Sequence, residues 1–253
     1  LQFETDGTTT PTIVANRLQA VTIQNDLVAA ADLTMNVYDG DADGDLIIEG
    51  QISGDGAITK IENGTLVLAG DNTYTGTTTI SAGVVQVGNG GTTGSLGAGS
   101  VENKSSLVFN RSNDLTVSNS ISGSGAVTKS GAGTVTLASS NSTSGSITVA
   151  EGTLNVAAAI TSASSITVSP GAVLRFSGSN LITSSHGTAE SASSYVTVDG
   201  GTWVSDAGVC RIGNVNLLNG AIWEANVTNE DWGNFYLGAL SDGSDATVTV
   251  GGT

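Results

Sequence analysis

Short stretches in which apolar and polar residues alternate recur along the whole chain and predict β-strands. Successive side chains of a strand point to opposite faces, so the apolar positions identify the buried face. Residues 66–68 read LVL and residues 135–137 read VTL. We therefore expect the first and third residues of both stretches to be buried and the middle residue to face outwards. Apolar residues at helical spacing, with charges on the opposite face, are absent, so almost no α-helix is predicted.

Two segments of the chain match one another without a gap, at the constant offset that separates Ile52 from Ile121. Starting from these two residues, they read ISGDGAITKIENGTLVLAGDNTYTGTTTISAGVVQV and ISGSGAVTKSGAGTVTLASSNSTSGSITVAEGTLNV. Within each segment two glycines recur at the same spacing, which in the first segment runs from Gly64 to Gly83. A period of about 20 residues is typical of a solenoid, in which each repeat is one coil that stacks on the next. The sequence therefore predicts an all-β, right-handed parallel β-helix.

The composition agrees with strands joined by tight turns. The 253 residues include 35 glycines, and only 12% are charged and 4% aromatic. Glycine supplies turn conformations that other residues avoid, whereas a low charge content suits strands that are buried on one face. We predict one continuous β-helix over residues 1–253, with first coils in 1–44, two 69-residue repeats in 45–182 and degenerate, aromatic-rich coils in 183–253.

The repeat has a recognisable consensus. Both copies, at about 52–88 and 121–157, contain the pattern G-x-G-x-h-x-K-x-x-x-G-T-h-x-L-x-x-x-N-x-x-x-G-x-[TS], in which h is apolar. This pattern resembles the autotransporter-associated β-strand repeat. The resemblance implies export from a bacterium and a β-helical passenger or stalk at the cell surface, often in adhesion. The repeat itself is a scaffold, so the resemblance assigns no chemistry to any residue.

Charge and residue counts exclude several classes of function. The formal net charge of −16, with only seven Lys and Arg, argues against nucleic acid as a partner, because such binding depends on cations that replace counterions. The segment also has no apolar run long enough for membrane insertion. A single histidine, His186, and a single cysteine, Cys210, cannot build a closed zinc site from nitrogen and sulfur ligands.

An acidic turn is the candidate metal site. Asp39, Asp41, Asp43 and Asp45 stand at alternate positions with glycines between or after them. Carboxylates spaced in this way resemble the start of a Ca²⁺-binding loop, although Gly50 occupies the place of the bidentate glutamate and no helices flank the turn. Two interpretations stay open, namely weak Ca²⁺ binding between coils and a solvated acidic turn. We expect no required cofactor.

Two lysines recur at the same repeat position, Lys60 in the first copy and Lys129 in the second. A catalytic site should interrupt a repeat, whereas these lysines follow it. We interpret them as structural groups that pair with a neighbouring carboxylate or a turn carbonyl. By contrast, Glu62 is replaced by Gly131 in the second copy. We interpret this difference as drift at a solvated surface.

Aromatic residues gather in the last third of the chain, at Tyr195, Trp203, Trp223, Trp232, Phe235 and Tyr236. Buried rings would widen the core where the coil type changes, whereas exposed rings stack on sugars or anchor interfaces. We favour packing. For the second interpretation, the candidate ligand residues are Trp223, Asp231, Trp232 and Tyr236.

Two functions from different classes follow. The first is a structural or adhesive rod segment, not an enzyme, of an extracellular or surface-bound bacterial protein, whose partner is a component of a host or neighbouring cell, or a polysaccharide. The alternative is a carbohydrate-binding or carbohydrate-cleaving β-helix that uses the aromatic-rich third. Neither end of the sequence shows an amphipathic helix or charged plug, so we also expect homo-oligomers formed by end-to-end stacking of coils.

Overall fold

A computed structural model describes residues 2–4, 10–16, 19–40, 44–178, 195–206, 211–226, 236–242 and 247–250. All regular elements within these ranges are β-strands, which confirms the predicted all-β class. The chain forms two compact units. Unit 1 comprises Leu1–Asn113 and Ile121–Ala126, and unit 2 comprises Asp114–Ser120 and Val127–Thr253. Each unit is a parallel β-solenoid and is described by itself, so one continuous body over residues 1–253 stays a prediction.

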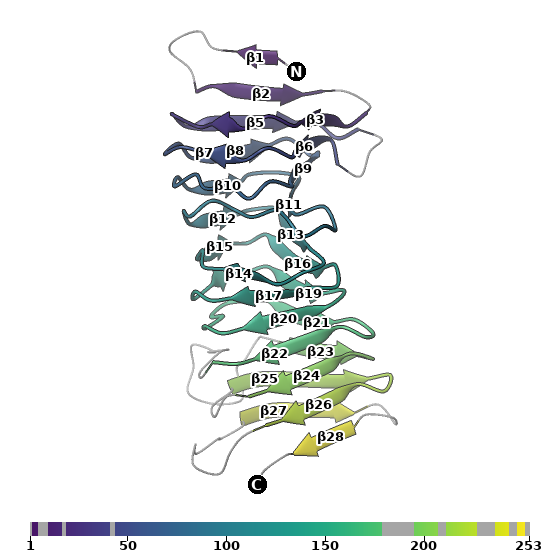
Figure 1. Ribbon diagram of the computed structural model, residues 1–253. Coiled ribbons are helices and arrows are strands. Elements are labelled where there is room, and N and C mark those ends of the chain that lie inside the picture. Colours follow the sequence, from purple (N-terminus) through teal and green to yellow (C-terminus); the bar gives the residue numbers. More distant parts are fainter. Residues whose placement is uncertain are drawn as a thin grey trace. The chain divides into compact units, whose positions relative to one another are not determined.

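In unit 1, the described strands pair with the equivalent strands of the preceding and following coils, as a solenoid requires (Figure 1). One sheet has the order β1-β2-β5-β8-β10-β12-β15, a second has β3-β6-β9-β11-β13, and β4 pairs with β7. All of these pairs are parallel except β1 with β2, which is antiparallel. The bounds are β1 Gln2–Glu4, β2 Thr12–Ala15, β3 Val21–Ile23, β4 Leu27–Val28, β5 Leu33–Val37, β6 Leu46–Ile48, β7 Ile52–Ser53, β8 Ile58–Ile61, β9 Thr65–Leu68, β10 Thr78–Ile80, β11 Val84–Val87, β12 Val101–Asn103, β13 Ser106–Asn110 and β15 Ile121–Gly123.

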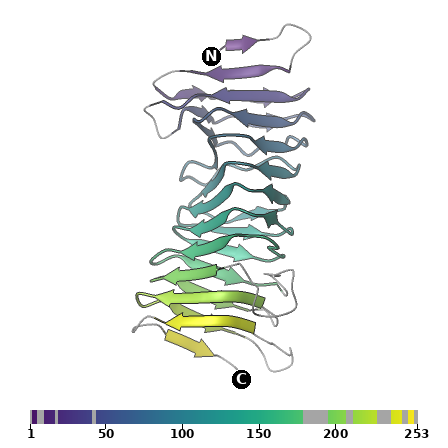
Figure 2. The ribbon, with the colours of Figure 1, turned by 180° about the vertical axis from the view of Figure 1, so that it is seen from behind.

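Unit 2 repeats this arrangement with two parallel sheets, whose strands lie side by side when they are seen from behind (Figure 2). The orders are β16-β19-β21-β23-β25-β27 and β14-β17-β20-β22-β24-β26-β28. The bounds are β14 Leu115–Val117, β16 Ala126–Ser130, β17 Thr134–Leu137, β18 Ser142–Thr143, β19 Ser146–Val149, β20 Thr153–Val156, β21 Ser165–Val168, β22 Val173–Phe176, β23 Tyr195–Asp199, β24 Thr202–Ser205, β25 Arg211–Leu218, β26 Ile222–Ala225, β27 Tyr236–Asp242 and β28 Thr247–Val250.

The inward face of each sheet is built from columns of apolar residues in register. Leu66 pairs with Val85 across β9 and β11, and Val135 pairs with Leu154 across β17 and β20. Leu66, Leu68, Val135 and Leu137 are all buried, as the alternation predicted. One detail differs, because Val67 is buried as well. The chain passes over this outward side chain at Gly44, where an added Cβ would lie 2.9 Å from its Cγ2.

The two repeat copies fold into the same series of elements. Strands β8, β9, β10 and β11 of the first copy correspond to β16, β17, β19 and β20 of the second. Their turns match as well, since the equivalent residues Gly83 and Gly152 have φ values of 67° and 65°. Only glycine adopts this conformation without strain, so the regular spacing of glycines marks where each coil turns.

Candidate functional site

Lys60 points into the core of unit 1 and is completely buried. Its backbone belongs to β8, at an inward position between Ile58 and the turn that follows the strand. The Nζ atom donates hydrogen bonds to three backbone carbonyls, those of Ile61 at 2.8 Å, Glu62 at 2.6 Å and Ala82 at 3.2 Å. The first two carbonyls lie in its own turn and the third lies in the turn of the next coil. The lysine therefore joins two successive turns.

Lys129 makes the corresponding contacts in unit 2, and 1% of its surface is exposed. Its Nζ atom donates to the carbonyls of Ser130 at 3.2 Å, Gly131 at 2.6 Å and Glu151 at 3.0 Å. These acceptors occupy the same places relative to the lysine as those of the first copy. We call each set of three carbonyls with its lysine a clasp. The turn-carbonyl interpretation of both lysines is confirmed.

The shortest bond of each clasp comes from a residue in the left-handed conformation. Glu62 has φ 66° and Gly131 has φ 79°. A residue with a side chain is strained in this conformation, whereas glycine is not. The exchange of Glu62 for Gly131 therefore keeps the left-handed backbone of the turn, and the drift interpretation, which concerns the side chain alone, stays a prediction. Both residues occupy a turn position whose left-handed backbone accompanies a carbonyl bonded to the lysine.

Burial sets the ionisation of both lysines. It lowers the pKa of Lys60 from 10.5 to about 8, and the nearby carboxylates of Asp45 and Glu62 act in the opposite direction. Burial also lowers the pKa of Lys129, opposed by the charge of Glu151. In both cases removal of the ammonium group from water outweighs the attraction of the acids. Three carbonyl acceptors around each Nζ atom match the three N–H donors of an ammonium ion.

The acidic turn is described only in part. Asp39 is exposed, Asp45 is buried, and Asp41 and Asp43 lie outside the described residues. The carboxylate of Asp45 accepts hydrogen bonds from the backbone N–H of Gly40 and of Thr65, both at 2.7 Å. Asp45 therefore caps backbone donors. Within the described ranges no three His, Cys, Asp or Glu residues lie close enough to share a metal ion. Ca²⁺ binding by this turn stays a prediction.

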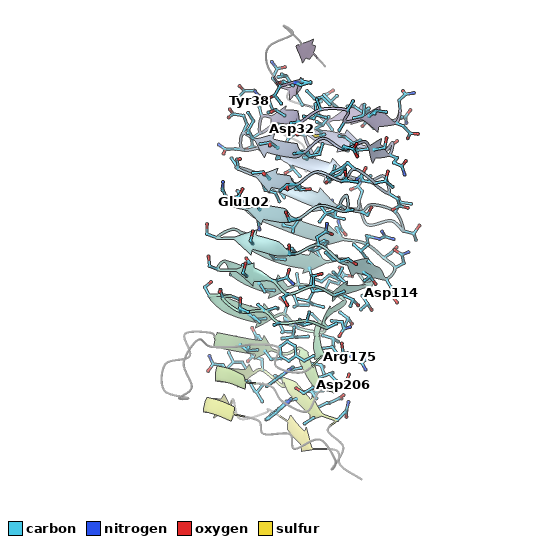
Figure 3. All side chains as sticks on the ribbon, turned by 90° about the vertical axis from the view of Figure 1, so that its left-hand side faces the viewer. Asp32, Tyr38, Glu102, Asp114, Arg175 and Asp206 are labelled. Carbon is cyan, nitrogen blue, oxygen red and sulfur yellow. The ribbon has the colours of Figure 1, made fainter. Side chains whose placement is uncertain are left out.

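Capping by Asp45 is itself a property of the repeat. Asp114 is the equivalent residue of the next copy, and its Oδ1 accepts from the N–H of Thr134 at 3.1 Å, as Asp45 does from Thr65 (Figure 3). Asp32 plays a similar part in unit 1, where it accepts from the N–H of Ala57 at 2.9 Å. The matching positions of Asp45 and Asp114 in the two copies are the sequence signal for this role.

The described aromatic rings of unit 2 pack inside the solenoid. Trp203 is completely buried and Trp223 is 7% exposed, and their rings stack with centroids 4.8 Å apart and planes 6° from parallel. Phe176 meets Trp203 edge-on at 6.0 Å. Register explains the stack, because Trp203 and Trp223 occupy paired positions in β24 and β26. Small residues, Ser205 and Ala225, fill the next inward column beside them.

Trp223 therefore does not fit the proposed role of an exposed, sugar-stacking ring, because it lies in the core. Asp231 and Trp232 lie outside the described residues, and only the backbone of Tyr236, in β27, is described. His186 and Cys210 also lie outside them. At the surface of unit 2, the described side chains of Arg175 and Asp206 form an ion pair (Figure 3).

Arg111 is a buried charged residue that the sequence did not single out. Its guanidinium donates to the carbonyls of Gly94 at 2.7 Å and Thr92 at 2.5 Å, and to Oδ1 of Asn113 at 3.0 Å. These bonds hold the glycine-rich stretch between β11 and β12. The sequence signal that could have revealed this role of Arg111 is the stretch NGGTTG. This stretch makes the coil from β11 to its partner β13 longer than the coil from β9 to β11.

Comparison with known proteins identifies the repeat. A family model described as the passenger-associated-transport-repeat matches residues 58–87 and 127–156, which contain both clasps. The adhesin BmaC autotransporter of Brucella suis biovar 1 (strain 1330) is 44% identical over 86 residues. That alignment covers 32% of this chain and only 2% of the adhesin's length.

No solved structure is significantly similar to the chain. The described residues contain no helix that is long and apolar enough to cross a membrane. The two family matches coincide with the two copies found from the constant offset, and they confirm the resemblance drawn from the consensus. Residues 58–87 and 127–156 are thus each similar to the passenger-associated-transport-repeat, and one stretch of the chain is similar to an autotransporter adhesin.

Proposed function

We propose that the chain is a structural or adhesive segment of a bacterial protein that is exposed at the cell surface or secreted. The observation that carries this proposal is that both family-matched repeats build the same solenoid coils around the same buried clasp. A related segment, 44% identical over 86 residues, belongs to an autotransporter adhesin. Stacked coils hold outward side chains at fixed intervals, which suits a spacer or a contact surface.

The proposal assigns no catalysis to the chain. In the described part, several buried charged groups already serve the backbone, since the lysines donate to carbonyls and Asp45 accepts from amides. General acid–base chemistry needs such groups within reach of a substrate. The stacked Trp203 and Trp223 are buried, so these two described rings do not favour the carbohydrate-binding or carbohydrate-cleaving alternative.

The proposed partners are a component of a host or neighbouring cell surface, or a polysaccharide. A net charge of −16 opposes nucleic acid as a partner. End-to-end assembly of copies is a finer proposal. Sedimentation of the full chain at increasing protein and salt concentrations tests this assembly.

Surface display tests the main proposal. The full chain is displayed on a non-adherent bacterium, and attachment to epithelial cells and to immobilised polysaccharides is counted. The control carries Leu137→Asp, which places a charge in the core and unfolds the repeat. We expect the displayed chain, once protease resistance verifies that it is folded, to increase attachment. As a spacer, it should hold a binding domain that is fused to its end farther from the cell surface. A folded chain that does neither, or one that cleaves polysaccharide, would overturn the proposal.

A further inference from the structure

The clasp has the properties of a binding site for an amine. Each clasp presents three carbonyl oxygens to one nitrogen atom, at 2.6–3.2 Å in both copies. An ammonium group on a primary alkyl chain carries three N–H donors on one nitrogen, and among side chains only lysine does so. We propose that the three carbonyls of each clasp form a preorganised site for a primary alkylamine, which the chain fills with its own lysine.

Backbone strain at Glu62 supports preorganisation. Glu62 is one of two non-glycine residues with positive φ in the described part of the chain, and the other, Asn219, is of a type that tolerates this conformation. Strain in a local backbone persists only where the surrounding structure demands it. Here the strained residue supplies the shortest bond of the clasp, its carbonyl to Nζ at 2.6 Å. The turn is thus held in the shape that directs this carbonyl at the amine.

The surroundings of the two clasps differ, while the three carbonyls do not. Lys60 pairs across the sheet with Met35 and Ile80, whereas Lys129 pairs with Val149. The acids that act on the two lysines also differ in number and position. Among the described carboxylates none forms an ion pair with either lysine. The carbonyls are therefore the shared element of recognition.

Chemical rescue of an emptied clasp tests this proposal. In the full chain, Lys60→Ala and, separately, Lys129→Ala remove the amine together with the three methylene groups beyond Cβ. A cavity made in this way can take up a small ligand from solution. The thermal midpoint of each variant is measured at neutral pH with increasing n-propylamine, which is present as n-propylammonium. The controls are n-propanol, which has the stem without three N–H donors, and propyltrimethylammonium, which has the charge without any.

We expect n-propylammonium to raise the midpoint of both alanine variants in a saturable way, and to leave the wild-type chain unchanged. Neither control compound should do so. Lys60→Met and Lys129→Met, which fill the stem and lack donors, should melt below wild type and show no rescue. The proposal is overturned if n-propanol rescues as well as n-propylammonium, if no compound rescues, or if the methionine variants melt at the wild-type temperature. If Lys60→Ala does not fold, n-propylammonium added during refolding gives the same readout.

Discussion

The two repeat copies differ in sequence at the positions around their clasps, which shows how much variation the clasp tolerates. In the first copy the turn residue is Glu62, at φ 66°, and in the second it is Gly131, at φ 79°. The clasp distances from these residues to Nζ are nonetheless equal, at 2.6 Å. The position therefore selects a backbone conformation and a carbonyl direction, and the side chain is free to change.

Elsewhere the copies solve the same packing problem with different residues. In the first copy Tyr74 is buried, and its hydroxyl lies 2.7 Å from that of Thr78. In the second copy Thr143 and Ile147 stand at these positions, and both are buried. A large ring with a small polar neighbour is thus exchanged for a small residue with a larger apolar neighbour. Core volume, rather than the identity of each residue, is what the repeat maintains.

Exchanging the core residues between the copies should give the largest effect. Tyr74→Thr removes a buried ring that also contacts Gly97, where an added Cβ would lie 2.5 Å from a ring carbon. We expect a loss of about 3 kcal/mol in unfolding free energy, measured by urea denaturation. Tyr74→Phe, which removes only the hydroxyl, should cost about 1 kcal/mol. A smaller loss for threonine than for phenylalanine would contradict the packing explanation.

The capping aspartates should give the next largest difference in stability between the two copies. Asp45 is buried and accepts two backbone N–H groups, whereas Asp114 is exposed and accepts one that the structure describes. We expect Asp45→Ala to cost roughly 1–3 kcal/mol and Asp114→Ala roughly 0.5–1 kcal/mol in urea denaturation. Equal losses would show that burial of the cap does not matter. Calorimetry of Asp41→Ala combined with Asp43→Ala, in parallel, tests Ca²⁺ binding apart from capping.

The left-handed turn position gives a pair of reciprocal changes. Gly131→Glu places the residue of the first copy in the second and should destabilise the chain by about 1–2 kcal/mol, because only glycine adopts this conformation without strain. Glu62→Gly should stabilise it by a smaller amount, about 0.5 kcal/mol, since glycine also loses more entropy on folding. Urea midpoints of the two variants should therefore move in opposite directions. Movement in the same direction would refute a conformational cause.

The ionisation of Lys60 should have the smallest effect on folding stability at neutral pH, and this effect should grow as the pH rises. The pKa of Lys60 is lowered to about 8, so between pH 8 and its ordinary value of 10.5 the unfolded chain holds a proton that the folded chain has released. Folding stability from this group therefore rises with pH across that window. Urea midpoints of wild type and Lys60→Met, measured from neutral pH up to the ordinary lysine pKa, should diverge in favour of wild type. Parallel pH profiles would contradict the lowered pKa.

Sequence periodicity predicted the fold because a solenoid depends on local, repeated rules. Alternation placed Leu66 and Leu137 inside, and the constant offset located both repeats. The same offset linked Lys60 with its counterpart in the second copy and led to the carbonyl contacts. It did not reveal that Glu62 is left-handed, because a glutamate carries no sign of its backbone conformation. Burial of Val67 was also missed, since it depends on a distant stretch of chain.

The tryptophans belong to only one of the two units, so tryptophan fluorescence reports on that unit. All three, at positions 203, 223 and 232, belong to unit 2, and unit 1 has none. Trp203 is buried, and its indole N–H has no hydrogen-bond partner among the described residues, so its emission should lie at short wavelength and shift to the red when water reaches it. Tryptophan fluorescence therefore follows the opening of unit 2 alone, while circular dichroism follows the strands of both units. If fluorescence and circular dichroism change at different denaturant concentrations, the difference gives the order in which the two units unfold.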